Sequence, residues 1–237
     1  MYAAASGMAA QQTNLEIIAD NLANADVAGF KSAAASFTDV NAGGTLGLGT
    51  AILGRHAIFE QGKLMKSGGP FDIAIDGTGF FCVEKGGKTA YTRAGEFTRT
   101  ADGSLQNADG WTLHGTRLPA DAIAVSVEKD GHIFVDTAAG KHRAAGRILL
   151  AAFNAPEHLR PLGGTLFAAT AESGPARRFP PGGDHATVAF GMLEKSNVSI
   201  VESMMQILTA QRAYEANAKG VQAADEMLRI ANNLHRG

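Results

Sequence analysis

The sequence predicts an α+β fold, in which helices at both ends of the chain form a coiled-coil-like inner domain and the middle forms a β-rich domain. Apolar residues recur in steps of three and four from Met1 to Ala25 and again from Ser196 to His235, which is the spacing of an amphipathic helix. All seven prolines and most of the 29 glycines lie between residues 43 and 191, as is typical of short strands joined by turns. We therefore expect an N-terminal helical segment over 1–42, a linker over 43–70, a β-rich domain over 71–191 and a long helix over 192–237.

The N-terminal segment is predicted to be a helix with one narrow apolar stripe. Up to Ala25 it holds no proline and one glycine, Gly7, and Asn24, Asp26 and Gly29 then supply stop signals. The stripe consists of Met1, Ala4, Met8, Gln11, Leu15, Ile18, Leu22 and Ala25. Because a helix with so little apolar surface is marginal on its own in water, we expect it to pack against a partner.

The middle of the chain is predicted to contain antiparallel hairpins. Residues 71–76 alternate apolar with polar or small side chains, as a half-buried strand does. Strand-like runs flank Gly86-Gly87 and also Lys129-Asp130-Gly131, which are sequences that turn one strand back along another. Asp102-Gly103 and Asp109-Gly110 indicate two further tight turns.

The C-terminal segment is predicted to be one long helix. Ser199 with Glu202 fits a capping box at its start, and no proline follows. About 36 residues, at a rise of about 1.5 Å each, span roughly 55 Å. The apolar stripe of this helix is Ile200, Met204, Ile207, Gln211, Tyr214, Ala218, Val221 and Leu228, with Met227, Ile230 and Leu234 on an adjoining line.

Two arrangements of the end helices stay open. They pack on the central sheet of a globular α+β protein, or they pair with each other or with other chains as a coiled coil. The length of the C-terminal helix favours the second arrangement, because a domain of about 150 residues is too small to cover roughly 55 Å of helix. The apolar stripes are then expected to find their counterparts chiefly outside the β-rich domain.

Charge and hydropathy argue against two classes of partner. The chain has 21 Lys and Arg residues against 23 Asp and Glu residues, so no broad basic surface is predicted for nucleic acid or for an anionic membrane. No apolar run is long enough to form a membrane-spanning segment. We therefore predict neither a nucleic-acid partner nor a span across a bilayer.

The chemical motifs do not predict an active site. Cys82 is the one cysteine, the seven histidines lack metal-binding spacing, and no Gly-Lys-Ser/Thr follows the glycines of residues 43–49. Asp72 and Asp76 lie about 13 Å apart along a strand, too far for a pair of catalytic carboxylates, so both are expected to be solvated. We predict no catalytic residue, no cofactor, no metal and no enzyme activity, with a hydrolase or binding site in the β-rich domain as the alternative.

Several blocks of the sequence resemble one protein family. Residues Asn14–Asn24, followed by Gly29-Phe30-Lys31, resemble the N-terminal signature of bacterial flagellar rod and hook proteins. Further blocks resemble the same family in the same order: Asp72–Phe81, Tyr91–Thr98, Asp102-Gly103, Asn107–Gly110, Ser196–Val198, Gln211–Lys219 and Ala224–Leu228. The resemblance covers both ends of the chain and half of its middle.

Two departures from the family pattern affect the comparison. Asp20 stands where the family commonly has Asn. Residues 33–57 are short compared with the linkers of hook proteins, so a rod subunit is preferred to a hook subunit. Within the family, the block Gln211–Lys219 is most similar to distal rod subunits, while the compact length leaves proximal rod subunits open.

The resemblance implies a structural, self-assembling subunit of the flagellar basal-body rod, which crosses the periplasm and transmits torque. It implies an inner tube of end helices with the β-rich domain outside, other rod and hook subunits as partners, and export through the flagellar type III apparatus. Such export needs no cleaved signal peptide, and none is predicted, since the first charged residue is Glu16 and the first basic one is Lys31. An extracytoplasmic flagellar adaptor and a hook-type subunit are the alternatives.

Residues on the two apolar stripes and in the N-terminal signature are the candidates for contacts between subunits. They are Leu15, Ile18, Asn21, Leu22, Asn24, Phe30, Ile207, Gln211, Tyr214 and Leu228.

Overall fold

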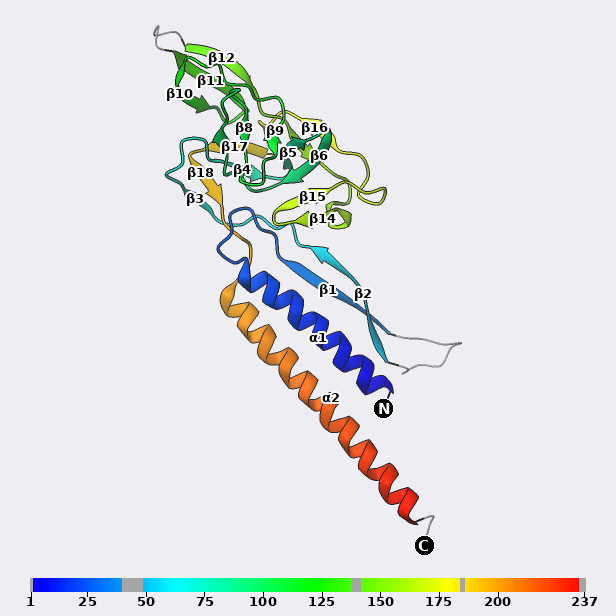
Figure 1. Cartoon of the computed structure of the whole chain (residues 1–237). Helices are drawn as coiled ribbons and strands as arrows, with labels where there is room; N and C mark the ends of the chain where they lie inside the picture. Colours follow the sequence, from blue (N-terminus) through cyan, green and yellow to red (C-terminus); the bar gives the residue numbers. More distant parts are fainter. Residues whose placement is uncertain (1, 40–48, 138–141, 184–185, 235–237) are drawn as a thin grey trace. The chain divides into compact units, whose positions relative to one another are not determined.

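The computed structural model describes residues 2–39, 49–137, 142–183 and 186–234 (Figure 1). It has a helix at each end and strands between them, which confirms the predicted α+β class. The described residues fall into two compact units. The helical unit comprises the described parts of 1–24, 33–58 and 198–237, and the β unit comprises those of 25–32 and 59–197. Met1 of the predicted stripe and most of the Gly-rich stretch 43–49 lie outside the described residues.

The helical unit contains α1 (Tyr2–Ala23) and α2 (Ile200–Leu234). Helix α1 ends where the stop signals predict, and the Asn24 side-chain amide donates a 2.8 Å hydrogen bond to the Asp20 carbonyl. Helix α2 begins after Ser199, whose hydroxyl accepts a 3.4 Å hydrogen bond from the Glu202 backbone N–H. That contact is the hydroxyl half of the predicted capping box.

A two-stranded antiparallel sheet completes the helical unit. Strand β1 (Ala33–Asp39) pairs with β2 (Thr50–Ala57), with a bulge between Ser36 and Phe37. The sequence analysis expected helix and linker in these ranges, and its division of the chain at residues 42, 70 and 191 stays a prediction. The sequence of β1 hides the strand, because three of its seven residues are alanine, which has low β-propensity.

The β unit contains the remaining strands and a short 3₁₀ helix. Their bounds are β3 (Leu64–Lys66), β4 (Ile73–Gly77), β5 (Phe80–Lys85), β6 (Lys88–Thr92), β7 (Thr98–Arg99), β8 (Leu105–Gln106), β9 (Thr112–Leu113), β10 (Ala122–Val127), β11 (His132–Thr137), β12 (His142–Arg147), β13 (Leu150–Ala152), η1 (Pro156–His158), β14 (Arg160–Gly163), β15 (Leu166–Ala168), β16 (Arg177–Phe179), β17 (Ala186–Phe190) and β18 (Met192–Glu194).

The largest sheet among the described residues joins nine strands. Its order is β14-β15-β6-β5-β9-β8-β7, and β13 joins β5 and β16. Strands β10, β11 and β12 form a second antiparallel sheet, and the pairs β4–β17 and β3–β18 lie beside them (Figure 1). The pairing of β3 with β18 brings residues that are far apart in the sequence to the point where the chain leaves for α2.

The turn predictions are confirmed. Gly86 and Gly87 join β5 to β6 with positive φ angles of 56° and 76°, and Gly131 joins β10 to β11 with φ of 84°. Positive φ is costly for any residue with a Cβ atom, so these turns select glycine.

The core of the β unit forms between its sheets. Strand β5 is buried on both faces, since Phe80, Phe81, Cys82 and Val83 are each at most 3% exposed. Ile73 and Ile75 of β4, Ile133 and Val135 of β11 and Leu150 of β13 pack in the same cluster. Asp72, expected to be solvated, is buried instead, and its carboxylate accepts a hydrogen bond from the Ser67 hydroxyl.

Gly95→Ala is expected to lower the free energy of unfolding of the β unit by about 3 kcal/mol, the upper end of overpacking costs. A Cβ at Gly95 would lie 1.6 Å from the carbonyl oxygen of Ile73, in backbone that has little freedom to move because Ile73 N–H bonds to the Gly95 carbonyl. Urea titration followed by fluorescence of Trp111 measures the change. Gly68→Ala is the control, because no atom lies within 4 Å of its Cβ position; equal midpoints for the two variants would contradict the prediction.

Candidate assembly surface

Helices α1 and α2 run antiparallel and pack along one face of each other (Figure 1). On α2 that face is made of small or partly polar residues, of which Ser203 and Ala210 are buried at 6% and 3% exposure. On α1 the buried residues are Ala10, Ile17 and Ile18. Small side chains let two helix backbones approach closely, so this contact uses little of the apolar surface of α2.

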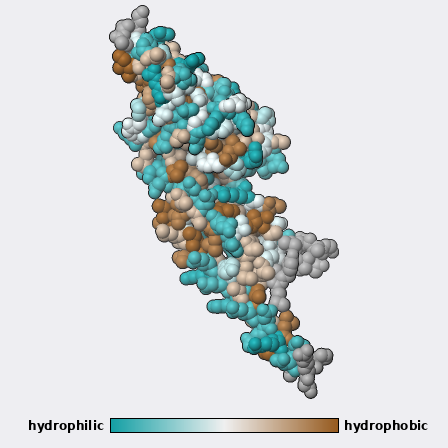
Figure 2. Space-filling model, viewed as in Figure 1, coloured by the Kyte–Doolittle hydropathy of each residue, from teal (hydrophilic) through white to brown (hydrophobic). Residues whose placement is uncertain are grey.

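The opposite face of α2 carries large apolar side chains in solvent. Val201, Met204, Met205 and Leu208 are exposed at 69, 54, 58 and 57%. Their spacing of three, four and seven residues places them on one face over two turns; we call these four residues the α2 outer face. Figure 2 shows hydrophobic side chains gathered over the first half of α2. A contiguous apolar patch on a soluble chain typically marks a contact with another protein.

The far end of α2 extends past α1. Gly7 of α1 lies against Asn217 of α2, and α2 has 35 residues against 22 in α1. The last turns of α2 therefore pass beyond Tyr2, over roughly 20 Å. Met227, Leu228 and Ile230 in this extension are exposed at 65, 57 and 53%, so a second group of apolar side chains is accessible there.

The contact candidates on α1 are engaged within the chain. Ile18 is buried, and Leu15 and Leu22 are half-buried. The buried Asn21 clamps the start of β1: its amide donates to the Ala33 carbonyl and its carbonyl oxygen accepts from the Ala33 N–H, each at 2.8 Å. These contacts give the candidates an internal role, and their contact with another subunit stays a prediction.

The other candidates divide between cap, core and surface. Asn24 caps α1, and Phe30 is buried in the β unit at 6% exposure. Ile207 is half-buried on the α1-facing side of α2, whereas Gln211, Tyr214 and Leu228 are exposed. Sequence reasoning missed Val201, Met205 and Leu208, although their helical spacing is a usable signal.

Polar contacts fix the edges of the helical unit. Asp20, the residue that departs from the family pattern, forms an ion pair with Arg55 of β2. At the other end of α1 the Ser6 hydroxyl accepts a 3.1 Å hydrogen bond from the Thr50 N–H. The hairpin β1–β2 is therefore held along α1 at both ends, which leaves the outer face of α2 free of this contact.

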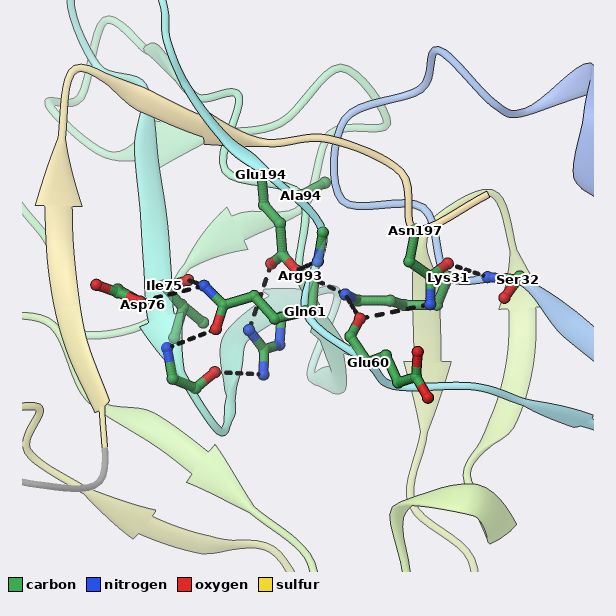
Figure 3. A network of polar contacts seen from close by, with 12 residues as sticks. Lys31, Ser32, Glu60, Gln61, Ile75, Asp76, Arg93, Ala94, Glu194 and Asn197 are labelled. Atoms are coloured by element: carbon green, nitrogen blue, oxygen red, sulfur yellow. Dashed lines mark hydrogen bonds and ion pairs between the residues drawn. The ribbon is translucent and has the colours of Figure 1, made fainter. Parts of the chain in front are cut away.

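A buried cluster of charges lies in the β unit (Figure 3). The Glu194 carboxylate sits between two cations: Oε1 is 2.6 Å from Lys31 Nζ and Oε2 is 3.3 Å from Arg93 Nη1. The three side chains are 0 to 3% exposed. The cluster holds two positive charges against one negative charge, and the Arg93 Nε has no hydrogen-bond partner among the described residues.

Burial governs the protonation of this cluster. Desolvation lowers the pKa of Lys31, and the charge and hydrogen bond of Glu194 oppose that effect. Desolvation likewise lowers the pKa of Arg93 against the pull of Glu194. Because the folded pKa values lie below the unfolded ones, keeping these cations charged in the folded chain has a net cost below those pKa values.

Cys82 and His114 lie close together in the β unit, where the Cys82 carbonyl accepts a 2.9 Å hydrogen bond from the His114 N–H. The described residues contain no group of three or more His, Cys, Asp or Glu side chains placed to hold a metal ion. Cys82 is fully buried, and desolvation raises the pKa of its thiol, which disfavours the reactive thiolate. Both ring nitrogens of the nearby His114 are engaged, one by Glu84 at 2.8 Å and the other by Arg178 at 2.9 Å.

Comparisons with known proteins identify the family. Residues 1–31 match the model for flagella basal body rod proteins, residues 74–135 match the D1 domain of flagellar hook protein FlgE/F/G, and residues 190–234 match the C-terminal region of flagellar basal body rod FlgEFG proteins. A flagellar basal-body rod protein FlgG of Agrobacterium fabrum is 37% identical over 97% of this chain and 96% of its own length. The chain belongs to the flagellar basal-body rod family.

Other relatives agree with this assignment. FlgG proteins of Borreliella burgdorferi and Bacillus subtilis are 37% and 33% identical over the whole of this chain and 98% of their own lengths. The flagellar hook protein FlgE of Salmonella typhimurium is 40% identical, but over 53% of this chain and 31% of its own length. Among the described helices of this family member, none is long and apolar enough to cross a membrane.

Ala210→Leu is expected to weaken the packing of α1 on α2 by about 1–3 kcal/mol, because Ala210 is buried between the helices and a larger side chain forces them apart. Hydrogen exchange of the α1 amides in the free subunit measures the effect, with faster exchange than in the wild type. Ala216→Leu, at an exposed position of the same helix, is the matched control. Unchanged α1 protection in Ala210→Leu would show that the helices do not pack through this residue.

Proposed function

We propose that this chain is a structural subunit of the distal flagellar rod and that it assembles through its helical unit with other copies of itself. The outer face of α2 is the observation that carries this proposal. Four large apolar side chains there are more than half exposed, and burying one Met or Leu contributes about 1.5–3 kcal/mol.

The difference in packing between the two units supports a role as the subunit of a polymer. The β unit contains a core of its own, with Ile73, Phe81 and Ile133 fully buried, so it folds without needing the helices for apolar cover. The helical unit, by contrast, leaves Val201, Met204, Met205 and Leu208 more than half exposed. In the proposed rod, the end helices form the inner tube, the β unit lies outside, and the assembly transmits torque across the periplasm.

The relatives support the proposed position within the flagellum. Rod proteins named FlgG align with nearly the whole chain, while the hook protein aligns with about half of it. We therefore place the subunit in the distal rod, with other rod and hook subunits as neighbours, in preference to a hook-type subunit or an extracytoplasmic adaptor. It reaches that position through the flagellar type III export apparatus without cleavage of a signal peptide, and it has no catalytic role.

The subunit contacts are assigned to the surfaces that remain exposed. The outer face of α2 provides the main contact, and the exposed Gln211, Tyr214 and Leu228, which lie off that face of the helix, provide further contacts. The remaining candidates support the fold of the subunit that carries this surface. They are Leu15, Ile18, Asn21, Leu22, Asn24, Phe30 and Ile207.

The triple substitution Met204→Gln, Met205→Gln and Leu208→Gln is expected to abolish polymerisation and motility while the helical content stays at the wild-type value. The changed side chains face solvent in the subunit, so the fold loses no buried contact. Circular dichroism, light scattering and swimming of a complemented deletion strain are the measurements. The control makes the same chemical change at exposed positions of the β unit, Met65→Gln, Ile123→Gln and Leu162→Gln; equal assembly of both triples would refute the role of the α2 outer face.

A tagged copy of the protein is expected in purified basal bodies, between the proximal rod and the hook, when viewed by immunogold electron microscopy. Mass spectrometry of that fraction is expected to recover an N-terminal peptide with no segment removed by a signal peptidase. A tagged protein that co-purifies with the hook alone, or that stays in the cytoplasm of a motile strain, would contradict the proposed place.

A further inference from the structure

The chain passes between the helical unit and the β unit four times, at residues 24/25, 32/33, 58/59 and 197/198. Three segments of the β unit adjoin these passages: 29–32, 60–63 and 194–197. The buried charge cluster takes one member or contact from each of them. Lys31 lies in the first segment and Glu194 in the third, and the second provides the Glu60 carbonyl, 2.6 Å from Lys31 Nζ.

Hydrogen bonds from backbone N–H groups connect the same three segments. The Gly29 N–H donates to the Glu194 carbonyl at 2.7 Å, and the Lys195 N–H donates to the Lys63 carbonyl at 2.9 Å. The Gly62 N–H donates to Glu194 Oε1 at 2.8 Å. Gly62 also lies so close to Lys195 that a Cβ there would be 1.9 Å from the Lys195 carbonyl oxygen.

Arg93 attaches this junction to the β-unit core. Its Nη1 reaches Glu194 Oε2, and its Nη2 donates a 2.9 Å hydrogen bond to the carbonyl of Gly77 at the end of β4. The guanidinium lies 5.5 Å from the centroid of the Phe80 ring, a cation–π contact with the first residue of β5. The Asn197 side chain extends the network on the other side, where its Oδ1 accepts a 2.7 Å hydrogen bond from the Ser32 N–H (Figure 3).

We infer that Lys31, Glu194 and Arg93 form a clasp that holds segments 29–32, 60–63 and 194–197 of the β unit in one register, and that this local geometry, rather than added stability, is its role in rod assembly. Two buried cations share one carboxylate, and desolvation opposes both, so the cluster is a poor source of stability compared with apolar residues of similar volume. Directional ion pairs and hydrogen bonds, unlike apolar contacts, hold three segments in one register. The inference rests on the proposed rod function.

The test variant replaces the whole clasp by apolar residues: Lys31→Met, Arg93→Met and Glu194→Met in the full chain. No buried charge is left unpaired, so the thermal midpoint of the β unit is expected to stay within a few degrees of the wild type. The amides of Gly29, Ser32 and Lys195 are expected to exchange at least about tenfold faster, as the constraint on their segments is lost. Their acceptors are not the replaced side-chain atoms, so faster exchange reports opening of the segments. Incorporation into basal bodies is expected to fall at least about tenfold.

The matched control removes a cluster of similar make-up from the surface of the β unit. Glu84 lies 2.8 Å from His114 Nδ1 and forms an ion pair with Arg178 Nη2 at 3.6 Å, and all three side chains are at least 31% exposed. The variant Glu84→Met, His114→Met and Arg178→Met is expected to keep wild-type exchange at Gly29, Ser32 and Lys195 and wild-type incorporation. Loss of incorporation in this control to the same extent would overturn the inference, because the effect would then not belong to the clasp.

Two further results overturn the inference: wild-type protection of the three amides in the clasp variant, or wild-type incorporation despite their faster exchange. If the apolar variant does not fold, Glu194→Asp decides by the same readouts, since its shorter side chain keeps the charge but cannot reach both cations at the present distances. The amide exchange is measured on the free subunit, independently of assembly. Absence of the wild-type protein from basal bodies would refute the rod function, whereas a wild-type rod with an unaffected clasp variant refutes the clasp alone.

Discussion

The buried carboxylate of Glu194 connects the segments of the β unit that adjoin the passages to the helical unit. Glu194 is the last residue of β18, six residues before α2 begins at Ile200, and its carboxylate accepts hydrogen bonds from Lys31, Arg93 and the Gly62 N–H. Burying two cations with one anion has a desolvation cost that the mutual attraction does not clearly recover. The chain passes four times between its two units. Directional bonds to Glu194 hold the segments of the β unit that adjoin these passages.

The distribution of side-chain size on α2 explains why a single subunit is incomplete. Ser203 and Ala210 face α1, whereas Met204, Met205 and Leu208 face solvent. A self-contained helical hairpin would place the larger side chains inside, since burial of each contributes about 1.5–3 kcal/mol. Here Ile17 and Ile18 of α1 are buried, while Met204, Met205 and Leu208 of α2 remain more than half exposed. In the proposed rod, contact with another copy buries these exposed side chains.

Local features of the fold could be predicted from the sequence, and distant ones could not. The turns at Gly86-Gly87 and Gly131 and the ends of both helices depend on neighbouring residues, so composition and spacing were sufficient to place them. Strand β1 was not predicted because its alanines favour helix. Its partner β2 begins only at Thr50, after a stretch without strand-like alternation. The predicted apolar stripe of α2 includes Gln211 and Tyr214, but both are exposed. The buried positions hold Ser203 and Ala210, whose small or polar side chains do not indicate an apolar stripe. Lys31 and Glu194 are 163 residues apart, and no periodicity connects them.

The unequal lengths of the two helices bear on the kind of assembly they can build. The outer face near the start of α2 and the exposed Met227, Leu228 and Ile230 near its end are separated by about 23 residues, or roughly 35 Å of helix. A closed two-fold dimer can cover both groups when the two α2 helices lie antiparallel, because each group then meets the other group of the partner. A head-to-tail contact, in which different patches meet, can cover both and has no built-in end unless a rotation closes it into a ring. The proposed rod requires the head-to-tail contact, which builds an open helical array.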